Sequence, residues 1–219
     1  MSEQKMITET RDVSGFEGVS LGGYGTVNIT QGDHTSLTIE AAEDVLPRVV
    51  AEVKNGVLVL RLEKEGWLNG LKEKRQSIRF DVTMKNIKNL SLSGVGRIDA
   101  PRVDTDTLAL VVSGVGAIEI GALSAESLDV ILSGAGNCEV AGRVTSQTIK
   151  LSGAGNYKAP DLESENVGAV VSGAGNVTVH ATDTLDAKVT GAGSIRYQGA
   201  PTVRQRVTGV GSVVCTACE

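Results

Sequence analysis

A five-residue motif recurs at a nearly constant interval through most of this chain. Ser-Gly-Ala-Gly-Asn occurs at residues 133–137, 152–156 and 172–176, and near-copies begin at Ser93, Ser113, Thr190 and Thr208. From the first copy to the last, the spacings are 20, 20, 19, 20, 18 and 18 residues. A repeat this regular constrains the fold more than any single residue, because each unit must bury its apolar side against its neighbours.

The residues on both sides of each motif alternate with period two. The residue before the Ser or Thr is always branched and apolar: Leu92, Val112, Leu132, Leu151, Val171, Val189 and Val207. Three positions before it the residue is again apolar, except for Gln205 in the last copy. Five and seven positions after it stand two more apolar columns. This alternation predicts two half-buried strands joined by a glycine turn.

A unit of 18–20 residues without a helical segment is typical of one coil of a parallel β-helix. We therefore predict an all-β fold, a right-handed single-stranded parallel β-helix of about eight rungs, with the degenerate copy Gly22–Thr26 in the first rung. Leucine-rich repeats share this period but need a helix or 3₁₀ segment on the return. A dinucleotide-binding fold would show one glycine loop followed by a helix.

The whole chain, residues 1–219, is expected to form one domain. Its parts are a first rung (1–29), an inserted hairpin with further strands (30–89), seven regular rungs (90–215) and a tail (216–219). Within the insertion, residues 36–41 and 78–84 alternate as strands, and Asn55-Gly56 predicts a hairpin turn. Glu43–Leu46 suggests one helical turn ended by Pro47, and residues 63–75 form a charged loop with the only tryptophan, Trp67.

The corner residues are interpreted as structural, because a motif that recurs once per rung is more than one active site would need. Glycine permits positive φ and close backbone approach. The Asn residues would either form an amide ladder between rungs or each hold a left-handed corner. These corner residues are Gly94, Gly96, Gly114, Gly116, Gly134, Gly136, Asn137, Gly153, Gly155, Asn156, Gly173, Gly175, Asn176, Gly191, Gly193, Gly209 and Gly211.

Composition excludes several classes of partner. A net charge of −5 without a basic cluster argues against nucleic acid. No run of 18 apolar residues is present, so no membrane span is expected. The N-terminal residues contain no apolar run typical of a signal peptide. The protein is therefore either cytoplasmic or exported by a signal that lies outside this sequence.

No metal site, cofactor or catalytic residue is predicted. Cys138 and Cys215 fall in interior columns, whereas Cys215 and Cys218 also form a C-x-x-C that would suit a redox pair or half a metal site. A zinc site would need two more ligands. Asp99, Glu119 and Glu139 stand on successive rungs, about 5 Å apart, which is near the carboxyl separation of a retaining glycosidase. No aromatic residue accompanies them in those columns, so a row of solvated charges is the favoured interpretation.

A strip of Val111, Ile131 and Val170 stands on an outward column that elsewhere carries Lys150, Lys188 and Arg206. An apolar strip on an outward face can be a contact surface. Alternatively, part of the insertion covers it.

The repeated corners, together with Thr10–Phe16 and Leu46–Gly56, resemble the head GIN domain of autotransporter adhesins. The resemblance extends from about Thr8 to Val214. It implies a secreted or envelope-anchored β-helical protein, extracellular or in the cell envelope, with no established catalytic residues. The chain departs from the usual corner at Arg97 and Ala117.

Three functions are considered. The leading hypothesis is a non-enzymatic surface or envelope module, an adhesin head or scaffold, that binds a surface glycan or host protein. The alternatives are a carbohydrate-active β-helix enzyme and a cytoplasmic self-assembling scaffold. A homo-oligomer is expected, with either the terminal coil or the apolar strip as its contact, because an uncovered last coil would present unpaired backbone groups.

Overall fold

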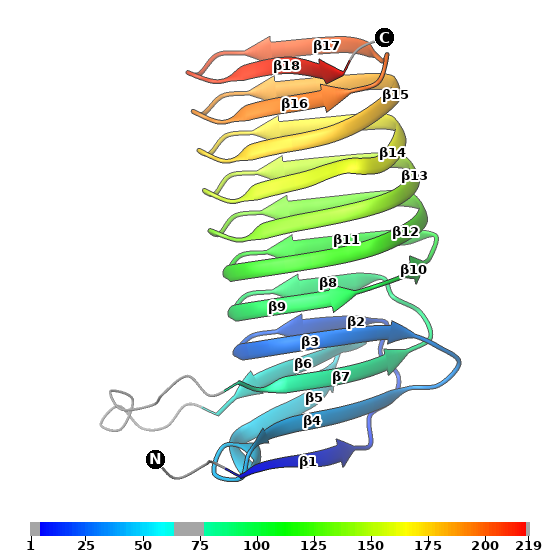
Figure 1. Ribbon diagram of the computed structural model, residues 1–219, viewed down its shortest axis with the longest axis vertical. Coiled ribbons are helices and arrows are strands. Elements are labelled where there is room, and N and C mark those ends of the chain that lie inside the picture. Colours follow the sequence, from blue (N-terminus) through cyan, green and yellow to red (C-terminus); the bar gives the residue numbers. More distant parts are fainter. Residues whose placement is uncertain (1–4, 64–76, 218–219) are drawn as a thin grey trace.

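The computed structural model describes residues 5–63 and 77–217, which form a β-solenoid (Figure 1). One continuous hydrogen-bonded sheet is wound so that two sides, the back sheet and the front sheet, face each other. The predicted all-β parallel β-helix is therefore confirmed. The chain makes about six turns, fewer than the eight rungs expected. Six intervals separate the seven regular corners. The insertion separates the first corner, Gly22–Thr26, from them in sequence, but this corner stacks directly beneath the one at Ser93.

The back sheet contains the strands that lead into the glycine corners. They are β2 (Gly18–Leu21), β8 (Asn89–Leu92), β11 (Thr107–Val112), the second halves of β12 (Val115–Leu132), β13 (Asn137–Leu151), β14 (Asn156–Val171) and β15 (Asn176–Val189), and β17 (Thr202–Val207). Neighbouring strands are parallel and in register, so that Leu110 pairs with Leu90 below and Val130 above.

The front sheet contains the strands that leave those corners, and it is nearer the viewer in Figure 1. They are β3 (Tyr24–Gln31), β9 (Val95–Ala100), the first halves of β12 to β15, β16 (Ser194–Gln198) and β18 (Ser212–Ala217). The short β10 (Val103–Asp104) lies at the far corner and pairs with β12.

The insertion extends both sheets at the N-terminal end of the stack. β7 (Arg79–Met84) pairs with β3, and β4 (Ser36–Ala42) and β1 (Met6–Arg11) follow it in antiparallel order. β5 (Val49–Lys54) and β6 (Val57–Leu62) form the expected hairpin, and β6 continues the back sheet beneath β2. Its turn has positive φ at both Asn55 and Gly56, which matches the type I′ geometry that this dipeptide favours.

The helical turn expected at Glu43–Leu46 is wrong in position. The structure has a 3₁₀ helix, η1 (Leu46–Arg48), with Pro47 in its first turn. Proline lacks an N–H, and the first turn of a helix needs none, so Pro47 starts this element instead of ending one. Trp67 lies outside the described residues.

The core fills the space between the two sheets with inward side chains from every coil. It consists of Val, Leu, Ile and Ala together with a few larger residues. A chain of hydrogen bonds interrupts it: Tyr157 donates to Gln147 Oε1 (2.8 Å), and Gln147 Nε2 donates to Ser164 Oγ (2.6 Å). Ser164 in turn donates to the carbonyl of Leu162. Buried polar groups that are paired in this way avoid the cost of desolvation.

The corner glycines are required by close approach of the backbone. At Gly134, a Cβ atom would overlap the carbonyl oxygen of Gly114 in the coil below. That same carbonyl accepts a hydrogen bond from the N–H of Ala135 (3.2 Å). The overlap recurs at the first glycine of every regular corner. Gly134 does not have a positive φ, so the conformational reason expected from sequence does not apply there.

Replacing Gly134 with Val should destabilise the fold, because the added side chain cannot fit without separating two coils. We expect a loss of about 3 kcal/mol, measured by chemical denaturation. Gly168→Val is the matched control, since a Cβ at Gly168 meets nothing within 4 Å. Equal stability of the two variants would contradict the steric explanation.

The interior also predicts a loss of stability in alkali. Burial, and to a lesser extent Glu139, raises the pKa of Cys138 above its ordinary value of 9.0. Burial likewise raises the pKa of Tyr157 well above 10.0. Unfolding therefore releases protons at high pH, and the stability present below about pH 9 is lost as pH rises.

Chemical denaturation of the protein and of Cys138→Ala between pH 7 and 10.5 measures how much of this loss of stability comes from ionisation of the Cys138 thiol. The slope of unfolding free energy against pH should be shallower in the variant by up to about 1.4 kcal/mol per pH unit above pH 9. Parallel curves for the two proteins would show that Cys138 is not protected from ionisation.

Candidate functional site

The outward face of the front sheet carries side chains in straight columns, because the strands stack in register. Closest to the glycine corner lies an amide ladder. Asn156 Nδ2 donates to Asn137 Oδ1 (3.0 Å), and Asn176 Nδ2 donates to Asn156 Oδ1 (3.1 Å). Ser194 and Ser212 continue this column, with 3.2 Å between their hydroxyl oxygens. Each amide is thus held in one orientation by its neighbour.

The left-handed alternative for these asparagines is not observed. Asn55 is the only non-glycine residue with positive φ in the described ranges 5–63 and 77–217. The corner asparagines instead begin extended strands β13, β14 and β15. The orientation that these asparagines repeat from coil to coil therefore comes from side-chain hydrogen bonds between coils and not from a special backbone conformation.

The next column of the front sheet is charged and changes sign along the stack. We name it the charged column, and its members in order are Asp81, Asn28, Asp99, Glu119, Glu139, Lys158, Thr178, Arg196 and Val214. The acidic members stand near the inserted strands, and the basic members stand near the last coil. A partner laid along this face would meet an ordered gradient of charge.

Arg97 neutralises the acidic part of the charged column. Its guanidinium forms ion pairs with Asp99 and with Glu119 on the next coil. Hydrogen bonding to Asp99 raises the pKa of Arg97. Both carboxylates are therefore engaged in ion pairs with the same guanidinium on the surface of the sheet. This pairing favours the interpretation of Asp99 and Glu119 as surface charges.

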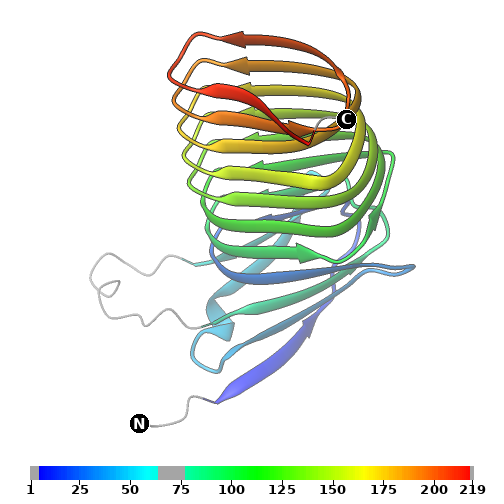
Figure 2. The same cartoon turned by 45° about the horizontal axis from the view of Figure 1, so that its top comes forward.

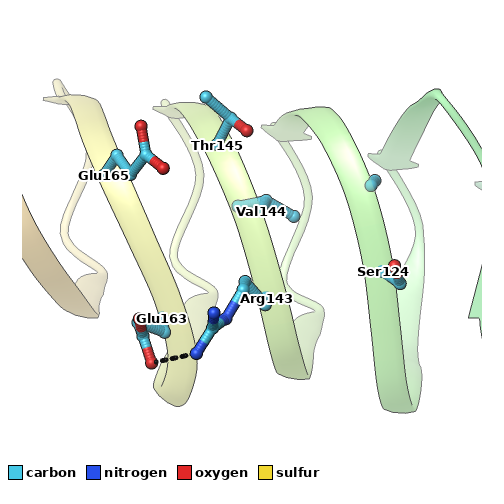
Figure 3. A pocket seen from close by; sticks show the side chains of 7 residues that line it. Ser124, Arg143, Val144, Thr145, Glu163 and Glu165 are labelled. Atoms are coloured by element: carbon cyan, nitrogen blue, oxygen red, sulfur yellow. Dashed lines mark hydrogen bonds and ion pairs between the residues drawn. The ribbon is translucent and has the colours of Figure 1, made fainter.

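The far corner, opposite the glycines, has a small hollow that the sequence did not indicate (Figure 3). It measures about 170 Å³ and lies between successive coils. Arg143 and Glu163 face each other at one end with an ion pair of 3.0 Å, and Thr145 and Glu165 lie at the other. A second hollow of about 160 Å³ is lined by Glu119, Glu139 and Asp161, among others. Both are smaller than ordinary ligand pockets.

The apolar strip lies on the outward side of the back sheet. Val111 and Ile131 are paired in register, but Lys150 separates Ile131 from Val170. Ile131 is 43% exposed and Val170 38%. The described strands of the insertion all lie at the N-terminal end, against β2 and β3, and do not reach it. The strip is therefore short and broken.

Of the two cysteines in the described residues, Cys138 lies in the core and Cys215 is disulfide-bonded. Cys138 is free and buried beneath Tyr157, and Cys218 lies outside the described residues. Over residues 5–63 and 77–217, no three His, Cys, Asp or Glu side chains gather as a metal site. No helix in the described part of the chain has the length and apolar character needed to cross a bilayer.

A family described as "Putative auto-transporter adhesin, head GIN domain" matches residues 15–201. The chain belongs to this family. The resemblance drawn from the corner motifs and the Leu46–Gly56 stretch is therefore confirmed. A solved structure that is 28% identical to this chain is likewise described as that of a putative adhesin. No curated protein matches the sequence.

Solved structures share the whole architecture. A putative adhesin from Bacteroides fragilis NCTC 9343 is 28% identical, with a TM-score of 0.89 over 97% of this chain and 98% of the other. A putative adhesin from Parabacteroides distasonis ATCC 8503 is 23% identical, with a TM-score of 0.74 over 98% of each chain. A putative lipid binding protein from the same strain is 22% identical, with a TM-score of 0.73 over 96% of each chain. The last two show the fold alone.

The amide ladder should contribute measurably to stability, and its central member should contribute most. Asn156→Ala removes amide hydrogen bonds on both sides, whereas Asn137→Ala removes one. We expect losses of about 2 and about 1 kcal/mol in chemical denaturation. Equal, negligible losses would mean that water replaces these bonds without cost.

Proposed function

We propose that this chain is a non-enzymatic, adhesin-type module of the cell surface or envelope, and that the front sheet is its contact face. The observation that supports this proposal is the ordering of polar side chains on that sheet. The amide ladder and the charged column run side by side over consecutive coils.

Ordering matters for binding because a mobile side chain loses entropy when a partner immobilises it. In the ladder, Asn137, Asn156 and Asn176 are already fixed by one another. Beside them, Lys158 and Arg196 provide charged donors on the same face. Such a surface suits an extended polar macromolecule, either a surface glycan or a host protein, that lies across several coils.

We further propose that residues 1–219 form one domain. The strands of the first coils and of the insertion belong to a single hydrogen-bonded network, and one hydrophobic core joins them. The insertion therefore serves as the end of the solenoid and not as a separate binding unit.

Multivalent display tests the contact face. Beads coated with the protein should be retained on an array of surface glycans and extracellular proteins. Thr178→Glu should lower retention at least tenfold, because the new carboxylate engages Lys158 and Arg196. Thr148→Glu is the matched control, since Thr148 lies outward on the back sheet. The array identifies which class of partner is bound.

Failure of every bead to bind any array member would overturn the adhesin proposal. An equal loss of bead retention with the two substitutions would show that the contact does not lie on the front sheet. Antibody labelling of intact cells tests the location separately, and labelling only after permeabilisation would refute a surface position.

A further inference from the structure

The two ends of the solenoid are built differently. At the N-terminal end, the inserted strands reverse direction and η1 closes over the core, with Phe16, Val45 and Leu46 buried there. The Arg11 side chain donates hydrogen bonds to the carbonyls of Val49 and Leu46. The apolar core is therefore covered by side chains at this end. In the described residues, the outermost strands β1 and β5 each have one partner and run antiparallel to it, so they do not continue the parallel stack.

The other end is an uncovered coil (Figure 2). In the described part of the chain, β17 pairs only with β15, and β18 pairs only with β16. The strands beneath them are paired on both sides. The outer edges of β17 and β18 therefore present backbone N–H and C=O groups that can hydrogen-bond to further strands.

The last coil also leaves apolar side chains uncovered. One coil earlier, the inward residues Leu185, Val189 and Ile195 are at most 1% exposed. In the last coil, Val207 is 41% exposed, and Val213 is only partly buried. The inward columns of the core thus end in a half-covered apolar rim, framed by two edge strands.

We propose that a second copy of this chain covers this end through a two-fold axis, with β17 of each copy antiparallel to β18 of the other. Two-fold contacts are self-complementary, so each strand must fit its mate. β17 and β18 are both six residues long, so five residues of each strand can pair on both sheets. The covered N-terminal end makes a head-to-tail filament unfavourable.

Charge selects this arrangement over the alternative in which β17 meets β17. Arg204 and Arg206 point outward from β17 and are exposed. Pairing β17 with its own copy would bring four arginines together, which is destabilising. The outward residues of β18 are Ser212, Val214 and Thr216, which carry no charge.

Gln205 gains a function in this arrangement. It is the only polar residue in its inward column, and it is exposed at the end of the core. The two-fold axis brings the Gln205 side chains of both copies toward each other across the core, where two amides can pair. A single polar pair within an apolar contact fixes register and stoichiometry.

The pleat of the strands makes the pairing testable. Outward residues must meet outward residues, so β17 and β18 are offset by one residue in either direction, and Val214 stands opposite either Arg204 or Arg206 of the other copy. The expected state is a dimer by sedimentation equilibrium. Val214→Glu should tighten dimerisation about tenfold, and Val214→Arg should weaken it by at least as much. High salt should reduce both effects.

Pairing of β18 with β18 predicts the opposite for Val214→Glu, because the two glutamates would then face each other. Weakening by Val214→Glu would therefore overturn the proposed arrangement. Thermal melting of each variant separates loss of contact from loss of the last coil. Ile131→Glu is the control on the apolar strip, and dissociation by that change would also overturn the proposal. A monomer at all concentrations would likewise overturn the proposal.

Discussion

Each coil of this protein is held to the next by a carbonyl oxygen that occupies the place of a missing side chain. The carbonyl of the first corner glycine accepts the N–H of the small apolar residue one coil above, and it stands where a Cβ of the next glycine would be. No residue with a side chain can therefore occupy this position unless the two coils move apart. Because this contact repeats at every coil, the strands on both sides of it are forced into register.

The register between coils determines how side chains are arranged on the surface of the solenoid. Once the corners align, residues at the same position of successive repeats stack above one another and form columns. Asn137, Asn156 and Asn176 thereby become a ladder, and the residues two positions later become the charged column. An adhesin-type contact needs extent and rigidity more than it needs a pocket. The same backbone contact that stabilises the stack provides both.

The repeat made the coils, the inward columns and the Asn55-Gly56 hairpin predictable, since these follow from local periodicity. Close backbone approach was one of the two reasons predicted for the corner glycines, but the carbonyl that each glycine meets could not be named, because a contact between coils is not visible within one coil. Gln147 and Ser164 were missed for a related reason: their hydrogen bonds join the far corners of successive coils, where the period varies. The ion pair of Arg143 with Glu163 likewise depends on register at a bulged corner. Such contacts require the stacking to be known first.

A solenoid has no intrinsic stopping point, so its ends must be specified apart from the repeat. At the N-terminal end this is achieved by strands that run in the opposite direction and by Arg11, whose side chain donates hydrogen bonds to the carbonyls of Val49 and Leu46. At the other end the repeat itself changes: the inward column receives Gln205, and the outward column receives Arg206 after Lys188. Gln205 and Arg206 make the last coil a poorer template for unlimited stacking. They still allow the proposed contact with one second copy of the chain. The charge gradient along the front sheet would then be mirrored across the two-fold axis, with the basic members at the centre of an assembly twice as long.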